Sequence, residues 1–156
     1  MPVSVSKEGV RTPARAVSAD ARRLLKVVGL PDAELSLLLC DDAFIRGLNL
    51  QWRGKDEPTD VLSFAMGEGE DAGLNTDVLG DIVISVDTAA RQAAEHGHTL
   101  DGELRVLLVH GLLHLLGHDH LEPDAAATMR AKEAELLRAL GEGITGLVDR
   151  AGPADP

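Results

Sequence analysis

Residues 104–120 read LRVLLVHGLLHLLGHDH, and this stretch determines how the rest of the chain is interpreted. The part before its Gly117 is apolar nearly all round, which predicts a helix that is buried on most of its faces. His110 and His114 are four residues apart, so a helix places them on one face. Gly117 predicts the end of that helix, because glycine readily adopts the left-handed conformation that reverses a chain. Such a reversal returns His120 towards the first two histidines.

The three histidines have the spacing of a metal site. Two imidazoles in one apolar turn are costly to bury unless their nitrogens have partners, and a metal ion is such a partner. The spacing His-x3-His-x2-Gly-x2-His is that of the metzincin zinc proteases. The sequence therefore predicts His110, His114 and His120 as the ligands of one Zn²⁺ ion, with Ni²⁺ or another divalent metal as alternatives. Three histidines with purely structural partners are the competing interpretation.

The neighbouring residues refine this prediction. Three neutral ligands leave an open fourth position on the ion, which is the pattern of a catalytic site where bound water has a pKa of about 7. His118 competes as the third ligand. Gly117 is expected to break the helix before it, so His120 is favoured. Asp119 is predicted to orient a ligand histidine or the water on the metal.

One position departs from the protease pattern. Metalloproteases place a glutamate directly after the first histidine as the general base, and here that position is Gly111. Peptide hydrolysis is harder to achieve without this carboxylate. Phosphodiester hydrolysis tolerates its absence better, because a cation such as arginine stabilises the charge that develops on the phosphoryl oxygens.

The size and composition of the chain indicate one globular domain. We expect this domain to span residues 1–150 of the 156, with a disordered tail over 151–156. Two phenylalanines, one tryptophan and no tyrosine predict an aliphatic core. The single cysteine, Cys40, excludes a disulfide framework and a cysteine-rich zinc site, and we expect a buried, inert thiol. No secretory signal and no membrane-spanning run is recognisable, which predicts a cytoplasmic protein.

The charge of the chain is unevenly distributed. The net charge of −11 at first argues against a nucleic-acid partner. Residues 1–55 nevertheless carry nine Lys and Arg against six Asp and Glu, whereas residues 56–156 carry six basic and twenty acidic residues. An anionic ligand would therefore be bound by the N-terminal third. A soluble acidic protein whose basic residues are merely solvated is the competing interpretation.

The sequence pattern predicts a mixture of strands and helices, which indicates an α+β or mixed-sheet domain. Strands are expected at residues 3–5 (an edge strand), 34–40, 61–66 and 79–86. Helices are expected at 21–28 with Ser18 as N-cap, from Asp41 to about 50, from Asp87 to about 96, at 104–116, and from Pro123 to 140. The segments 52–58 and 67–77 are predicted to be loops.

Two further stretches agree with the histidine segment. Residues 48–64 contain LN, WRGKD and PTDVLSF in that order, and residues 79–85 read LGDIVIS. Together with residues 110–120, they resemble the YbeY family, bacterial metal-dependent endoribonucleases that are also called rRNA maturation factors. The resemblance is colinear over roughly residues 35–140. The family has tyrosine where this chain has His118, which leaves the three presumed ligands intact but removes a tyrosine contact.

The resemblance implies a fold, an activity and partners. The implied fold is zincin-like, a single α+β domain with a small mixed sheet flanked by helices and a metal in a cleft. The implied activity is cleavage of single-stranded RNA in 16S rRNA 3′-end maturation and ribosome quality control. The implied partners are rRNA or other single-stranded RNA and the small ribosomal subunit with its assembly proteins, whereas neither DNA nor a membrane is expected.

The resemblance also implies that Arg53 is a functional residue near the metal. The positive charge of its region supports a phosphate-binding role, while a surface or loop-anchoring role is the alternative. The predicted catalytic residues are therefore Arg53, His110 and Asp119. Trp52 is a candidate for stacking on an RNA base, but packing is favoured because a chain with few aromatic residues has few ways to fill large gaps in its core.

Three polar residues of the motifs are interpreted as supporting groups. Asp60 and Ser63 are expected to support the metal ligands, and capping of the strand that follows is an equally good role for Asp60. Asp81, at the start of a strand, is expected to be structural.

Two other functions stay open. One is a zincin-type metallopeptidase or other hydrolase, which the histidine spacing supports and Gly111 opposes. The other is a non-catalytic ribosome-assembly factor in which the metal holds the fold and the acidic remainder contacts basic ribosomal proteins. For the nuclease, the nucleophile is either water on the metal or the 2′-hydroxyl of the RNA.

Overall fold

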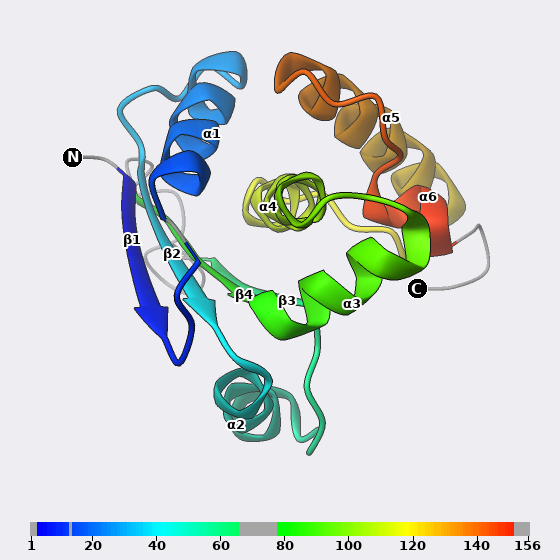
Figure 1. Ribbon diagram of the computed structural model, residues 1–156. Helices are drawn as coiled ribbons and strands as arrows, with labels where there is room; N and C mark the ends of the chain where they lie inside the picture. The colour runs from blue at the N-terminus through cyan, green and yellow to red at the C-terminus, as the bar shows by residue number, and fades with distance from the viewer. Residues whose placement is uncertain (1–2, 13, 66–77, 152–156) are drawn as a thin grey trace, which may run out of the picture.

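The computed structural model describes residues 3–12, 14–65 and 78–151, which form a four-stranded sheet with helices packed on it (Figure 1). The strands are β1 (Val3–Glu8), β2 (Glu34–Cys40), β3 (Val61–Ala65) and β4 (Val78–Ser85). Their order in the sheet is β1-β2-β4-β3; β2 is parallel to β1 and β4, whereas β3 is antiparallel to β4. The predicted α+β fold with a small mixed sheet is confirmed, and so is the edge position of β1.

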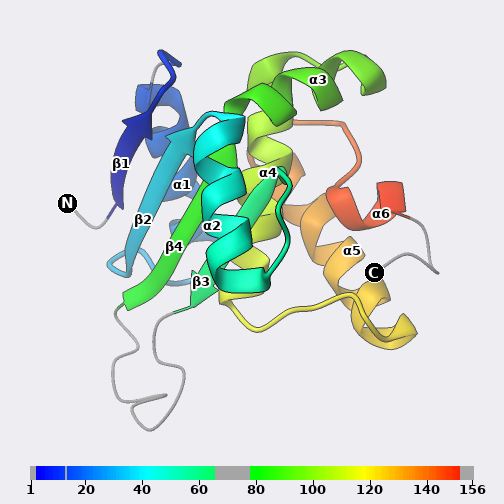
Figure 2. The same cartoon turned by 90° about the horizontal axis from the view of Figure 1, so that it is seen from below.

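The helices are arranged unequally on the two faces of the sheet. In the described part of the chain they are α1 (Ala14–Val27), α2 (Asp42–Arg53), α3 (Val86–His96), α4 (Leu100–Leu115), α5 (Pro123–Ala139) and α6 (Leu147–Ala151). Figure 1 looks along α4, which lies between the sheet and the surrounding helices α1, α3, α5 and α6. Helix α2 lies on the opposite face, where Figure 2 shows it in front of the sheet. None of the described helices is long and apolar enough to cross a membrane.

The alternation of side chains along β2 divides the core between these two faces. Leu37 and Leu39 point into the larger cluster, which the helices around α4 complete. Leu38 and Cys40 point into a smaller cluster with Ile45 of α2. The core is largely aliphatic, as predicted from the composition. Cys40 is fully buried, and this burial raises the pKa of its thiol to about 12, which agrees with the predicted inert role.

The structure corrects where two helices begin. Helix α1 starts at Ala14 instead of after Ser18, because its apolar face already begins with the buried Val17. Ser18 is inside the helix, where its hydroxyl accepts a hydrogen bond from Arg22. The N-cap of α3 is Ser85 rather than Asp87, since the Ser85 hydroxyl accepts a hydrogen bond from the backbone N–H of Thr88.

Three other segments differ from the prediction. Helix α4 begins four residues early, with Thr99 as its N-cap. Helix α2 continues through Trp52 and Arg53, which were predicted to be in a loop, because its left-handed C-cap is Gly54, with a φ of 70°. The short α6 was not predicted, and it ends at Ala151, the first residue of the expected disordered tail. The predicted loop 67–77 and residues 152–156 of the predicted tail lie outside the described residues.

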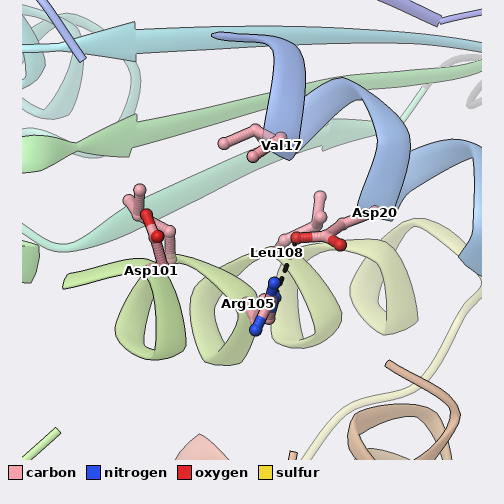
Figure 3. A pocket seen from close by; sticks show the side chains of 7 residues that line it. Val17, Asp20, Asp101, Arg105 and Leu108 are labelled. Carbon is pink, nitrogen blue, oxygen red and sulfur yellow. Dashed lines mark hydrogen bonds and ion pairs between the residues drawn. The ribbon is translucent and has the colours of Figure 1, made fainter. Parts of the chain in front are cut away.

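Helix α4 makes one close contact with the sheet, and one of its ion pairs joins it to α1. A Cβ atom built on Gly111 would lie 2.9 Å from Cγ2 of Ile82 and 3.2 Å from Oγ of Ser63. The Ser63 hydroxyl donates a hydrogen bond to the backbone oxygen of Gly111. Figure 3 shows Arg105 of α4 directed at Asp20 of α1, at a distance of 3.0 Å. The glycine that replaces the protease glutamate therefore faces the sheet at a position without room for a side chain.

Substitution of Gly111 tests this close contact. We expect Gly111→Ala to lower the free energy of unfolding by about 1–3 kcal/mol, because overpacking against β4 outweighs the gain in helix propensity. The matched control is Gly47→Ala, at an exposed site inside α2 where a Cβ atom meets nothing within 4 Å. Gly47→Ala should stabilise the protein by about 0.5–1 kcal/mol. Urea unfolding measures both values, and equal effects would contradict the packing argument.

Candidate metal centre

The structure brings His110, His114 and His120 together. The first two lie one turn apart on α4, and their Nε2 atoms are 3.1 Å from each other. One ring nitrogen from each of the three residues lies within 4.8 Å of the others. His110 is buried, and the other two are half-buried. This is a donor set of three imidazoles that suits Zn²⁺ and related ions.

The turn after α4 places His120 in this cluster. Gly117 has a φ of 94°, the left-handed conformation predicted for it. Its N–H donates to the carbonyl of His114, and the N–H of His118 donates to the carbonyl of Leu113. The N···O distance is 3.0 Å in both hydrogen bonds. These two hydrogen bonds form a Schellman motif, which reverses the chain at the end of a helix. His118 is outside the three-histidine group that the structure brings together.

A buried carboxylate that sequence reasoning missed contacts the cluster. Glu133 of α5 is fully buried, and its Oε2 lies 2.9 Å from Nδ1 of His110. Its Oε1 accepts a hydrogen bond of 2.9 Å from the backbone N–H of Val148. Gly146 packs directly against the Glu133 side chain. A carboxylate at Nδ1 holds the proton on that nitrogen and leaves Nε2 as a free donor for a metal. The sequence did contain a signal, because Glu133 occupies a core-facing position of an otherwise apolar helix face.

The protonation of the cluster also suits a metal. Burial, followed by the nearby His110 and His120, lowers the pKa of His114 to about 4, so its imidazole is neutral at pH 7. Neutral imidazole is the form that binds metal ions. In addition, the buried Nδ1 of His120 has no hydrogen-bond partner among the described residues. The residues present therefore fit a bound divalent ion.

A cleft joins the three histidines to Arg53. Arg53, the last residue of α2, lines this cleft together with Lys55 and the cluster. Arg150 lines it as well, but its guanidinium binds both carboxylate oxygens of the buried Glu103, at 2.6 and 2.7 Å. Arg53 is exposed and has no such partner among the described residues. Of these two arginines, Arg53 is the one whose guanidinium is available to an anionic ligand.

Two acidic residues that were predicted to support the site line the cleft and have hydrogen-bond partners outside the three histidines. Asp119 lines the cleft, but its carboxylate accepts a hydrogen bond from the backbone N–H of Leu121 in the turn. Asp60 accepts from the N–H of Val61 and from the side chain of Gln92, which favours its role at the start of β3. The catalytic role of Asp119 stays a prediction.

Three other motif residues differ from their predicted roles. Ser63 contacts α4 through Gly111 rather than a metal ligand. Asp81 is exposed on β4, and no structural partner for it is found among the described residues. The prediction that Trp52 fills a gap in the core is wrong, because its side chain is 63% exposed at the end of α2.

The fold and the cleft define a small α+β domain with three converging histidines that suit a metal ion. The family model of Endoribonuclease YbeY matches residues 3–141, which is most of the chain. The chain therefore belongs to the YbeY family.

Individual relatives agree with this membership. The Endoribonuclease YbeY of Anaeromyxobacter dehalogenans is 50% identical over 145 residues, which cover 93% of this chain and 72% of the relative. That of Geobacter sulfurreducens is 45% identical over 152 residues, which cover 95% of this chain and 100% of the relative. A solution structure of a Thermotoga maritima protein is similar with a TM-score of 0.63 and 27% identity, covering 88% of this chain and 90% of the other.

The contact between Glu133 and His110 leads to a prediction about metal affinity. We expect Glu133→Gln to weaken Zn²⁺ binding by about 10- to 100-fold, because the amide no longer holds His110 in the metal-binding tautomer. The control is Glu135→Gln on the same helix, where the exposed carboxylate pairs with Lys132. Competition with a chromogenic chelator measures both affinities. Equal affinities for the two variants would show that the buried carboxylate does not support the ligand.

Proposed function

We propose that the protein is a zinc-dependent endoribonuclease that cleaves single-stranded RNA in rRNA processing, with 16S rRNA 3′-end maturation and ribosome quality control as its setting. The observation that carries the proposal is the common cleft of Arg53 and the three histidines in a chain of the YbeY family. A Lewis acid and a cation each stabilise the charge that develops on a phosphate group during cleavage. This cleft offers ligands for the first and a guanidinium for the second.

The proposed metal ligands are His110, His114 and His120. When bound, a Zn²⁺ ion at three neutral ligands would polarise a phosphoryl oxygen and lower the pKa of water. His110 is held in the required tautomer by Glu133. His114 contributes a neutral imidazole at pH 7, since burial lowers its pKa. These properties support a zincin-like arrangement with the metal in the cleft.

Arg53 is proposed to bind the phosphodiester that is cleaved. Its guanidinium can form two parallel hydrogen bonds with phosphate oxygens, and it keeps its positive charge at any physiological pH. Lys55 adds a second cation to the same cleft. Asp119, which also lines the cleft, is proposed as the group that orients a ligand or the nucleophile.

The peptidase alternative lacks a general base at the expected position. Gly111 faces Ile82 and Ser63 of the sheet, so a glutamate there would collide with the sheet instead of reaching the cleft. The alternative of an assembly factor without catalysis does not require Arg53. It therefore predicts normal rRNA maturation when Arg53 is replaced. The proposal is therefore tested most sharply at Arg53.

The test compares Arg53→Ala with His114→Ala and with Arg23→Ala, an exposed arginine on α1. We expect His114→Ala to lose bound zinc together with cleavage of single-stranded RNA. Arg53→Ala should keep one zinc ion per chain. Its cleavage rate should fall by about 10²- to 10³-fold, the usual effect of removing one such stabilising donor. Arg23→Ala should match the wild type. Elemental analysis and a gel-based cleavage assay on the same preparations provide the two readouts.

Two outcomes would contradict the proposal. Full cleavage by metal-free protein would exclude a role for the ion. Normal cleavage and normal rRNA maturation in cells with Arg53→Ala would favour the assembly-factor alternative.

A further inference from the structure

A second hollow lies beside the cleft, on the face of the sheet that carries α2. Its lining residues come from α2 and all four strands. They include all three aromatic residues of the chain, Phe44, Trp52 and Phe64. Aromatic side chains usually contribute strongly to cores, yet the larger core cluster contains none of them. We call this hollow the aromatic groove.

Helix α2 supplies the wall of the aromatic groove. Phe44, Leu48 and Trp52 follow one another at four-residue intervals, so they lie along one face of the helix. The side chains of Phe44 and Trp52 are 37% and 63% exposed. Phe64 of β3 meets Trp52 edge to face, with ring centroids 6.0 Å apart. The ring of Trp52 is thus supported at one side and open to solvent at the other.

The floor of the aromatic groove is partly polar. Its polar residues are Ser4 and Ser6 of β1, Ser36 of β2 and Asp81 of β4, whereas Leu38 and Val83 are apolar. The hydroxyls of Ser4 and Ser36 are 3.3 Å apart and exposed, and Asp81 is exposed as well. Small hydroxyl and carboxylate groups below open aromatic rings can hydrogen-bond the edges of flat, polar rings such as nucleobases.

The aromatic groove is continuous with the cleft of the three histidines. Ser63 and Ala65 of β3 line both hollows. At the same junction Trp52, in the groove, precedes Arg53, in the cleft. A stacking surface and the cation proposed to bind the cleaved phosphate therefore adjoin each other at the end of α2.

We propose that the aromatic groove binds unpaired bases of the RNA next to the phosphodiester that is cleaved, with Trp52 as the principal stacking residue. This inference rests on the proposed function, and it adds a substrate subsite outside the metal centre. Bases in a duplex are stacked on each other and cannot reach Trp52, whereas unpaired bases can. The groove thus gives a physical reason for preferring single-stranded RNA. It also provides affinity that does not depend on the charge of an acidic protein.

The single tryptophan makes the proposal directly measurable, since Trp52 is the only source of tryptophan fluorescence. The probes are an eight-nucleotide single-stranded RNA, the same oligonucleotide with abasic sugars, and an RNA duplex, each added to full-length protein in chelator to prevent cleavage. We expect the single strand to quench the fluorescence of Trp52, and the abasic strand and the duplex to leave it nearly unchanged.

Three variants then separate the groove from the metal centre. Trp52→Ala and Phe44→Ala should weaken binding of the labelled single strand, by about tenfold for Trp52→Ala. The matched control Leu50→Ala removes an apolar side chain of α2 that is 49% exposed, between Phe44 and Trp52 in exposure, and does not line the groove. The affinity of this variant should equal that of the wild type. With zinc present, Trp52→Ala should raise KM for the oligonucleotide while leaving the hydrolysis of bis(p-nitrophenyl) phosphate, which has no bases, unchanged.

The outcomes distinguish the groove from the proposed function. One outcome is that the wild type cleaves RNA without quenching of Trp52 fluorescence, and that Trp52→Ala and Leu50→Ala have equal KM values. That result would overturn the proposed role of the groove and leave the proposed nuclease activity in place. A wild type loaded with zinc that neither binds nor cleaves RNA would overturn both. Concentration-dependent self-association that Trp52→Ala abolishes, with unchanged RNA binding, would assign the groove to a second copy of the chain and overturn the inference.

Discussion

The close approach of α4 to the sheet is the constraint on which the rest of the structure depends. It requires a residue without a side chain at position 111, and this glycine follows directly after the first histidine of the cluster. Because α4 is enclosed by the sheet and four helices, His110 is removed from water and can be met by a carboxylate from α5. The same packing places the end of α4, and with it the turn that returns His120, at the cleft. The packing of α4 therefore determines both the core of the protein and its candidate metal centre.

The parts of the site that lie close together in sequence could be predicted, because local geometry determines them. The interval between His110 and His114 and the conformation of Gly117 follow from helix geometry alone. Glu133 could not be assigned in the same way, since its contact with His110 joins two helices across 23 positions of the chain. The same division between local and distant determinants holds for the fold. Strand positions followed from apolar runs, whereas the start of α1 depended on the burial of Val17 and that of α3 on which polar residue finds a partner in three dimensions.

Trp52 shows that amino-acid composition alone does not predict whether a side chain lies in the core or at the surface. Trp52 was expected to fill a gap in the core, yet the larger core cluster consists mainly of leucine, isoleucine, valine and alanine. The aromatic residues are concentrated on the face of the sheet where α2 is the one helix among the described elements. This distribution matters for a protein with a net charge of −11, because RNA is repelled over roughly a Debye length of about 10 Å. Arg53 and Lys55 place two positive charges at the cleft, whereas stacking of the kind proposed for Trp52 is a short-range interaction that salt affects little.

The hydrogen bond between Glu133 and Val148 connects the histidine cluster to the last helix of the described chain. Helix α6 has five residues, and the ion pair between Arg150 and Glu103 attaches it to α4. A nascent chain that has emerged only as far as α5 holds all three histidines and Glu133, but one oxygen of that buried carboxylate lacks its donor. We therefore expect the affinity of the three histidines for a metal ion to develop only after α6 has docked. Local opening of α6 would likewise weaken the binding of such an ion before the fold itself is lost.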